Sequence, residues 1–246
     1  MSAVGASHIP GKIKKHLISG GFRFGEFCDK IKNEVITVET CVIFCAGEFD
    51  VPIQPIRDGD LVIAADGGLR HLQRLGREPD LILGDFDSLG YVPENAAVYP
   101  VEKDDTDAML AIRRGLERNF RRFVVYGGLD GVRLDHTIAN FQTLRFLTDH
   151  GAAGYLVGKK YLATVVSNGS LTFSPKAKGI VSVFCLGADA RGVTLEGLRY
   201  PLGNGVLTSG YPLGVSNHFV GENARISVES GSLLVLWDRE NGFPGR

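Results

Sequence analysis

LVIAADGGLRHLQRLGREPDLILGDFD, residues 61–87, decides the fold of the N-terminal half of this chain. Two short apolar runs, residues 61–65 and 81–83, flank a helical pattern at residues 68–75. Apolar runs this short, without alternation, are typical of strands buried on both faces of a parallel sheet. The order strand, helix, strand therefore predicts an open α/β sheet, in which ligands bind at the carboxyl ends of the strands. Acidic residues follow both apolar runs: Asp66, Asp85 and Asp87.

The same pattern extends on both sides of this stretch. Further strands are expected at residues 41–46 and 123–126, and further helices at residues 106–118 and 135–147. After residue 154 the helical pattern stops, and β-rich runs recur at residues 161–166, 180–185, 192–198, 225–228 and 233–237. We therefore expect an open, mostly parallel α/β domain over residues 39–153 and an antiparallel β-sandwich domain over residues 154–246. Residues 1–38 lack a sustained period and are interpreted as an N-terminal extension.

Composition places the 246-residue chain among ordinary globular proteins. It is 44% hydrophobic and 22% charged, and its formal net charge is -1. That charge balance gives no general reason to bind nucleic acid or an anionic membrane. There is no apolar stretch of membrane-spanning or signal-peptide length, and the four cysteines lack the paired spacing of a zinc site. We expect reduced, packed thiols and a cytoplasmic location.

Asp85 and Asp87 are the first candidates for a metal site. Two residues apart at an extended strand end, their side chains would lie on one side while Phe86 points away. Magnesium prefers hard oxygen ligands, usually one or two carboxylates beside substrate phosphates. The alternative interpretation is a turn in which these carboxylates accept hydrogen bonds from local amides.

A second acidic segment, residues 103–107, precedes the predicted helix at 106–118. Thr106 can cap that helix, and Asp107 suits its positive end, so a structural explanation exists. This explanation leaves Lys103 and Asp104 unused. If the segment faces Asp85, Asp104 and Asp107 add acidity, and Lys103 can neutralise phosphate charge.

A third segment follows the apolar run at 123–126. Gly127 and Gly128 allow the backbone to approach a phosphate, and Arg133 offers a planar array of donors. Asp135 is a candidate general base or an orienting group at the metal site. Its alternative role is to cap the next helix, with His136 packed in the first turn.

Together these segments resemble the thiamine pyrophosphokinase family, and they occur in the family's order. The resemblance covers the chain from about residue 40 to its C-terminus and rests on five segments: residues 65–68, 84–88, 103–107, 127–136 with Asn140, and 214–217. It implies transfer of a pyrophosphoryl group from ATP to the hydroxyl of thiamine, with Mg²⁺ as cofactor, giving thiamine diphosphate and AMP. It also implies a homodimer whose active sites lie between the subunits.

The resemblance assigns roles to residues of this chain. Asp85, Asp87 and Asp107 would hold magnesium, Asp104 and Asp135 would complete the catalytic pocket, and Ser216 with Asn217 would bind thiamine. The nucleotide-binding candidates are Asp66, Gly67, Lys103, Thr106, Gly128, Arg133 and His136. Sequence alone does not choose between Asp104 and Asp135 as the base. A stacking tryptophan expected near the last strand has no counterpart at Val235, and the role of Trp237, two residues later, stays open.

Two other functions fit parts of the pattern. A metal-dependent phosphohydrolase would use Asp85 as nucleophile and Asp87 as acid/base, but it gives no role to residues 214–217 or to the β-rich second half. A non-catalytic sensor would bind ATP or thiamine without turnover. Formation of AMP that depends on a thiamine acceptor distinguishes the transferase from both.

Overall fold

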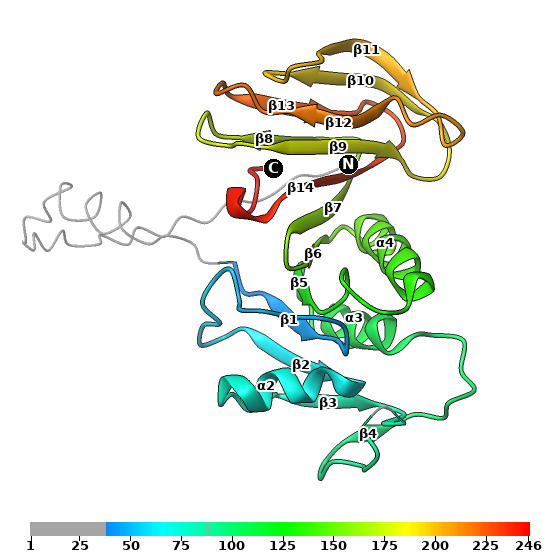
Figure 1. Ribbon diagram of the computed structural model, residues 1–246. Helices are drawn as coiled ribbons and strands as arrows, with labels where there is room; N and C mark the ends of the chain where they lie inside the picture. Colours follow the sequence, from blue (N-terminus) through cyan, green and yellow to red (C-terminus); the bar gives the residue numbers. More distant parts are fainter. Residues whose placement is uncertain (1–37, 88) are drawn as a thin grey trace, which may run out of the picture. The chain divides into compact units, whose positions relative to one another are not determined.

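In the computed structural model, which describes residues 38–87 and 89–246, a ten-stranded sheet forms the centre of the fold (Figure 1). Its mostly parallel part contains six strands: β1 (Cys41–Phe44), β2 (Leu61–Ala65), β3 (Leu81–Gly84), β4 (Ala97–Val98), β5 (Arg122–Tyr126) and β6 (Ala153–Val157). The other four strands pair antiparallel: β7 (Tyr161–Ser167), β9 (Ile180–Cys185), β12 (Gly214–His218) and β14 (Ser232–Asp238). The strand order is β12-β9-β14-β7-β6-β5-β1-β2-β3-β4.

A second, four-stranded antiparallel sheet belongs to the C-terminal half. Its order is β11-β10-β13-β8, with strands β8 (Ser170–Phe173), β10 (Ala190–Glu196), β11 (Leu202–Leu207) and β13 (Ala224–Ser227). Side chains of both sheets share one apolar core, in which the Phe173 ring meets the Trp237 indole edge to face at 5.5 Å. The predicted combination of a mostly parallel α/β sheet with an antiparallel β-rich half is confirmed.

Within the described residues, three α-helices cover the two faces of the parallel part. Apolar residues of α2 (Leu69–Leu75) join the core on one face, and those of α3 (Asp107–Glu117) and α4 (Leu134–Asp149) join the core on the other (Figure 1). Short 3₁₀ turns, η1 (Asp66–Gly68) and η2 (Arg239–Asn241), follow β2 and β14. Because these parallel strands are buried on both faces, their sequences are continuous apolar runs.

The main sheet does not stop at the expected domain boundary. β6 begins at Ala153 and pairs parallel with β5 on one side and antiparallel with β7 on the other. The division into residues 39–153 and 154–246 stays a prediction, as does the extension at 1–38, of which residues 1–37 lie outside the described part. Within the described residues, no helix has both the length and the apolar character needed to cross a membrane.

Candidate functional site

A cavity of about 540 Å³ opens at the carboxyl ends of β1, β2 and β5. Its walls come from the turns that follow these strands, from residues after β3, and from the first turns of α3 and α4. The lining includes Gly47, Asp66, Asp85, Asp87, Thr106, Asp107, Gly128, Arg133 and His136. Parallel strands bring their carboxyl ends to one edge of a sheet, so residues far apart in the sequence meet here.

Three carboxylates form the acidic centre of this cavity. One oxygen from each of Asp66, Asp85 and Asp87 lies within 4.8 Å of the others. Asp66 is buried and has a positive φ of 48°, and Gly84 allows the close approach of β3, since a Cβ at Gly84 would lie 3.0 Å from the Asp66 Cα. The cluster is therefore built from two neighbouring strand ends.

The backbone between Asp85 and Asp87 differs from the extended geometry expected from the sequence. Phe86 has a φ of 61°, which is left-handed, and its side chain is 3% exposed in the core beneath the site. Left-handed backbone is unfavourable for a residue with a Cβ. The prediction that Phe86 points away is confirmed, but the two carboxylates converge because of a turn, and the expected strand continuation is wrong.

Lys103 connects the cluster to α3. Its ammonium group lies 3.0 Å from an Asp85 carboxylate oxygen and 3.2 Å from an Asp107 oxygen. Burial raises the pKa of Asp85, but hydrogen bonds from Lys103 and the Asp87 amide outweigh it and hold that pKa below its usual value. Burial dominates at Asp107 and raises its pKa, although Lys103 opposes it.

The rest of the 103–107 segment divides between the cavity and solvent. The Thr106 side chain caps α3 by accepting a hydrogen bond from the Met109 amide at 3.2 Å, and Thr106 also lines the cavity. Asp104 is exposed and is not among the lining residues, and Asp105 pairs with Arg113. Among the acids of this segment, the fold therefore turns Asp107 toward the site.

Glycine-rich turns form the opposite wall. Gly127 has a φ of 69°, and a Cβ there would lie 2.5 Å from the Cys45 carbonyl oxygen. The Asn140 amide of α4 donates to the Gly128 carbonyl at 2.7 Å. Gly47, on the turn after β1, donates its N–H to the Gly127 carbonyl at 3.0 Å. Two strand ends are thus joined through their backbones, which leaves little side-chain bulk between them and a ligand.

Arg133 and Asp135 begin α4 at the rim of the cavity. They form an exposed ion pair, and a hydrogen bond from Arg133 holds the pKa of Asp135 below its usual value despite opposing desolvation. Arg133 and His136 line the cavity, whereas Asp135 does not. Arg133 occupies the N-cap position and no side chain caps the helix, so the alternative interpretation, in which Asp135 is the cap, is wrong. An ion-paired carboxylate is a weaker base than a free one.

The candidate thiamine residues lie outside this cavity. Ser216 is exposed, with a φ of 59°, and Asn217 is 2% exposed. The Asn217 side chain accepts from the Tyr200 amide at 2.9 Å and donates to the Tyr200 carbonyl at 2.7 Å. Trp237 is fully buried and donates its indole N–H to the Gly242 carbonyl at 2.9 Å. Gly67 is buried in η1 beneath the site.

The acidic centre suits a hard divalent cation. Three converging carboxylates supply the oxygen ligands that such ions prefer, with open space on the cavity side for further ligands. Cys45 lines the cavity too, but burial raises its pKa to about 12, so the thiol stays protonated and is a poor ligand near neutral pH.

Sequence analysis missed the Gly47 turn as part of the site. The signal was present, because Gly47 follows the apolar run at residues 41–46 as Asp66 and Gly67 follow the run at residues 61–65. It also missed that Asp66 belongs to the same carboxylate group as Asp85 and Asp87.

Comparison with known proteins agrees with this geometry. Family models match two regions: the thiamin pyrophosphokinase catalytic domain at residues 54–153 and the thiamin pyrophosphokinase vitamin B1 binding domain at residues 170–233. The thiamine pyrophosphokinase of Bacillus subtilis (strain 168) is 30% identical over 185 residues, which are 72% of this chain and 86% of that protein.

Solved structures show the same fold. The crystal structure of thiamine pyrophosphokinase from Bacillus subtilis matches with a TM-score of 0.71 at 26% identity, covering 81% of this chain and 99% of that one. A thiamin pyrophosphokinase family protein from Enterococcus faecalis matches with a TM-score of 0.69 at 27% identity, covering 81% and 98%. The chain belongs to the thiamin pyrophosphokinase family.

Proposed function

We propose that this protein transfers the pyrophosphoryl group of ATP to the hydroxyl oxygen of thiamine, giving thiamine diphosphate and AMP. The observation that carries the proposal is the cavity in which the Asp66, Asp85 and Asp87 carboxylates face glycine turns at the strand ends. Family membership supplies the substrates: the catalytic-domain match includes both strands that carry the carboxylates, and the vitamin B1 binding match covers residues 170–233.

The reaction needs attack on the β-phosphorus, because AMP is the leaving group. A new bond forms between the thiamine oxygen and the β-phosphorus, the bond to the oxygen bridging the α-phosphorus breaks, and the hydroxyl proton passes to a base. Such transfer depends chiefly on positioning and on stabilising charge at the phosphate oxygens. Backbone at Gly47 and Gly128 allows close approach of the triphosphate, and Arg133 offers donors from the rim.

The proposed cofactor is Mg²⁺, held by Asp85 and Asp87, with Asp66 and Asp107 beside them. When bound, the ion would neutralise charge that develops on the phosphate oxygens. Lys103, whose ammonium lies between Asp85 and Asp107, offers a further positive charge near the same phosphates. Among the candidate proton acceptors, Asp104 and Asp135 lie outside the cavity lining of a single copy.

The test measures both products together. Purified protein is incubated with ATP, Mg²⁺ and thiamine, and thiamine diphosphate and AMP are quantified. We expect equal amounts of the two products. We also expect Asp85→Asn and Asp87→Asn to lower the rate by at least about 100-fold, because the loss of a residue that only supports a metal ligand already costs up to about 100-fold. Phosphate release without thiamine diphosphate would favour a phosphohydrolase, and binding without turnover would favour a sensor.

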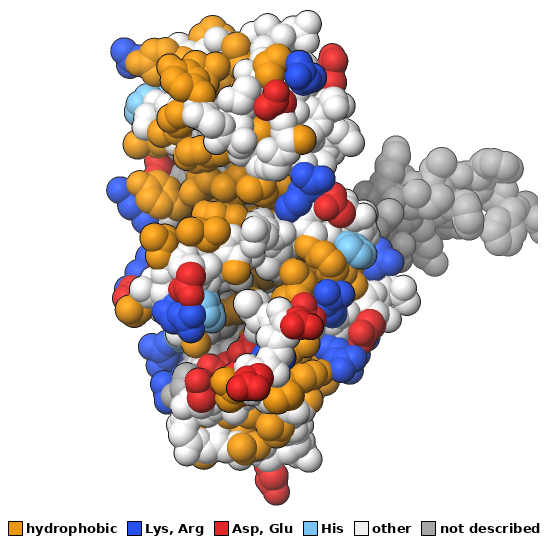
Figure 2. All heavy atoms as spheres, turned by 90° about the vertical axis from the view of Figure 1, so that its right-hand side faces the viewer, with side chains coloured by type: hydrophobic (Ala, Val, Ile, Leu, Met, Phe, Trp, Pro, Cys, Tyr) orange, Lys and Arg blue, Asp and Glu red, His pale blue; other side chains and the backbone are white. Residues whose placement is uncertain are grey.

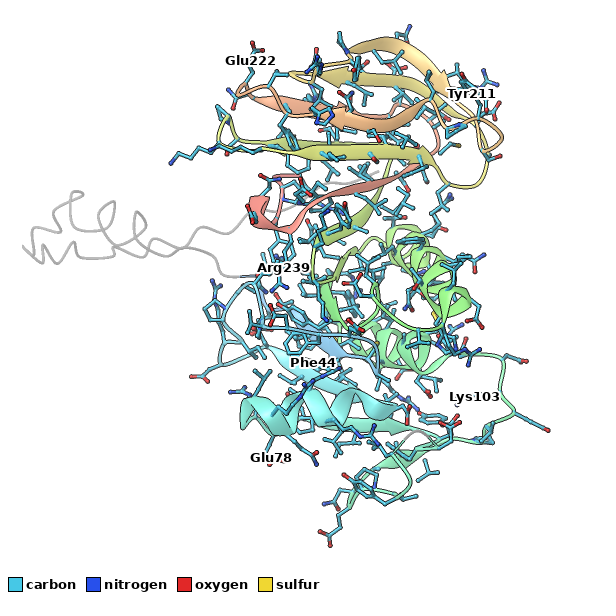
Figure 3. The ribbon with its side chains drawn as sticks, in the orientation of Figure 1. Phe44, Glu78, Lys103, Tyr211, Glu222 and Arg239 are labelled. Atoms are coloured by element: carbon cyan, nitrogen blue, oxygen red, sulfur yellow. The ribbon has the colours of Figure 1, made fainter. Side chains whose placement is uncertain are left out.

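We further propose a homodimer whose active sites lie between two copies. Ser216, the candidate thiamine-binding residue, does not line the cavity of one copy, and a second copy would bring it there. Exposed apolar residues occur in the same stretch of chain: Tyr200, Tyr211, Leu213 and Val215 are 58%, 67%, 53% and 40% exposed. Hydrophobic side chains gather over the upper part of the face in Figure 2. Tyr211 is labelled at the right of Figure 3, on the side of the molecule that faces the viewer in Figure 2. An apolar area of this kind is typical of an interface.

Light scattering should give twice the chain mass, and a monomer at micromolar concentration would contradict the dimer. Complementation tests the shared site. Asp85→Asn and Ser216→Gln proteins, each inactive at low thiamine, are mixed and allowed to exchange subunits. About a quarter of wild-type activity should return, because half of the dimers are mixed and each mixed dimer has one intact site. No recovery would place each site within one copy.

We also propose a cytoplasmic location. The free thiols of Cys41, Cys45 and Cys185 support it, because disulfides are rare in the reducing cytosol.

A further inference from the structure

His71 is a buried titratable group that the proposed chemistry does not use. It is the third residue of α2, is 7% exposed, and lies behind the wall of the cavity. Its Nε2 is 2.8 Å from the carbonyl oxygen of Gly47, and its Nδ1 contacts the Arg74 guanidinium. A buried imidazole with a defined partner at each nitrogen has a fixed orientation and a fixed proton position.

Arg74 determines which nitrogen carries the proton. A guanidinium only donates hydrogen bonds, so Nδ1 must accept, and the proton of the neutral ring is on Nε2. Nε2 then donates to the Gly47 carbonyl. Burial lowers the pKa of His71, and the Arg74 charge lowers it further against the opposing hydrogen bonds to Gly47 and Cys45, so the ring is neutral near pH 7. Phe49 packs against the ring with centroids 5.2 Å apart.

This hydrogen bond orients a peptide group of the cavity wall. In a trans peptide the C=O and N–H point in opposite directions, so a Gly47 carbonyl held by His71 directs the Glu48 N–H the other way. That N–H donates to the Asp130 carbonyl at 2.6 Å. Asp130 lies on the loop between β5 and α4, which carries Gly128 and Arg133. One imidazole is therefore linked, through one peptide, to the loop that forms the phosphate side of the cavity.

We propose that His71 is a positioning residue for pyrophosphoryl transfer, and that its Nε2–H tautomer, selected by Arg74, holds the Gly47–Glu48 peptide and the 128–133 loop in the geometry that receives the triphosphate. The proposal rests on the proposed function. His71 touches neither substrate, so it acts on binding through the loop. Since the same loop geometry serves the bound state and the transition state, its loss raises the KM for Mg·ATP more than it lowers kcat.

The variants separate the donor from the bulk of the side chain. His71→Leu removes the donor, and His71→Gln keeps an amide that can reach the Gly47 carbonyl. Arg74→Met leaves the imidazole but removes the group that selects its tautomer. His150→Leu is the matched control, because His150 also bonds a backbone carbonyl, that of Phe146 at 2.8 Å, but is exposed at the end of α4 and outside the cavity lining.

We expect His71→Leu to raise the KM for Mg·ATP about tenfold, the effect of one lost hydrogen bond, with a smaller change in kcat. His71→Gln should stay within about threefold of wild type, Arg74→Met should lie between the two, and His150→Leu should match wild type. Binding of Mg·α,β-methylene-ATP, in which the reacting bridge is carbon, should weaken by the same factors without turnover. Hydrogen exchange at the Glu48 amide should become faster in His71→Leu.

Several results would overturn the proposal: wild-type KM and analogue affinity in His71→Leu, an equal defect in His71→Gln, or an equal defect in His150→Leu. If His71→Leu does not fold, ¹⁵N NMR of the His71 imidazole in the wild-type protein still tests the proposal. A proton on Nδ1 would contradict the assigned tautomer. Failure of the proposed function is distinguishable. In that case the wild-type protein would form no thiamine diphosphate, while the variants would still rank in the expected order of affinity for Mg·α,β-methylene-ATP.

Discussion

Lys103, labelled in Figure 3, shows how a single residue changes the character of the acidic site. Its ammonium lies between Asp85 and Asp107, and its side chain is 13% exposed. Two carboxylates near one another repel, and a cation between them allows both to ionise. Lys103 is therefore a cation that compensates the negative charge of both Asp85 and Asp107.

Replacing Lys103 with Met should lower stability in chelator-treated protein at pH 8 and have less effect near pH 4. The lowered pKa of Asp85 means that its contribution to stability is present above its unfolded-state pKa and is lost as pH falls through the folded-state pKa. Without Lys103, ionised Asp85 and Asp107 repel, and protonation relieves this. Urea midpoints at both pH values provide the measurement, with the exposed Lys176→Met as the charge control. A pH-independent difference would contradict the explanation.

The acidic residues at the strand ends were predictable because parallel strands end at one edge. The grouping of Asp66 with Asp85 and Asp87 was not predictable. Asp66 joins Asp85 and Asp87 only because the chain turns with a positive φ at Asp66 and again at Phe86, and neither residue type signals left-handed backbone as glycine does. The role of His71 was equally hidden, since its partner Gly47 lies 24 residues earlier in the sequence.

At the scale of elements, α3 depends on its cap. The Thr106 side chain accepts from the Met109 amide, which would otherwise lack an intrahelical partner. Thr106→Ala should cost about 1 kcal/mol of stability, and Thr106→Ser, which keeps the acceptor, only a few tenths. Urea denaturation measures both. Equal losses in the two variants would mean that the methyl group, and not the cap, is what matters.

Two turns with similar backbone geometry differ in their surroundings. Gly76, after α2, has a φ of 63°, and a Cβ added there would meet no neighbouring described atom within 4 Å. Gly127 has a φ of 69°, and a Cβ added there would lie 2.5 Å from the Cys45 carbonyl oxygen. Gly76→Ala should cost about 1 kcal/mol, for the left-handed backbone alone. Gly127→Ala should cost about 3 kcal/mol, since the added methyl also displaces backbone.

Thermal or urea unfolding of the two glycine variants gives this difference directly. A loss in Gly127→Ala no larger than that in Gly76→Ala would show that the β1 and β5 turns separate readily. Because Gly127 also lines the cavity, its variant should lose activity as well, and Gly76→Ala should not.

The apolar runs that were predicted as strands correspond to described strands, and the three predicted helices correspond to α2, α3 and α4. No strand was predicted at β6, β8, β11 or β12. Periodicity does not predict which strands pair with one another. β14 reads as an ordinary apolar run at residues 233–237, and nothing in it indicates that it lies between β7 and β9. The short β4, with only Ala97 and Val98, carries too little pattern to be recognised.

For the whole molecule, the shared ten-stranded sheet predicts one unfolding transition for residues 38–246. Removing β6 from β7 would expose a row of unpaired backbone groups in the middle of the sheet, so neither half is expected to persist alone. Fluorescence of Trp237, the only tryptophan in the chain, reports on the C-terminal half, and far-UV circular dichroism reports on all of it. The two curves should coincide. Separate midpoints would instead support two independent domains.

The position of β14 has a consequence for how the chain is made. β9 and β12 are synthesised before β14, yet both connect to the rest of the ten-stranded sheet through it. While the ribosome is still adding residues 186–231, β7 has no partner on its outer side and β9 has no neighbour to join it to β7. The main sheet is therefore completed only when residues 232–238 leave the exit tunnel, so a nascent chain stalled before that point carries two open strand edges at which other chains can pair.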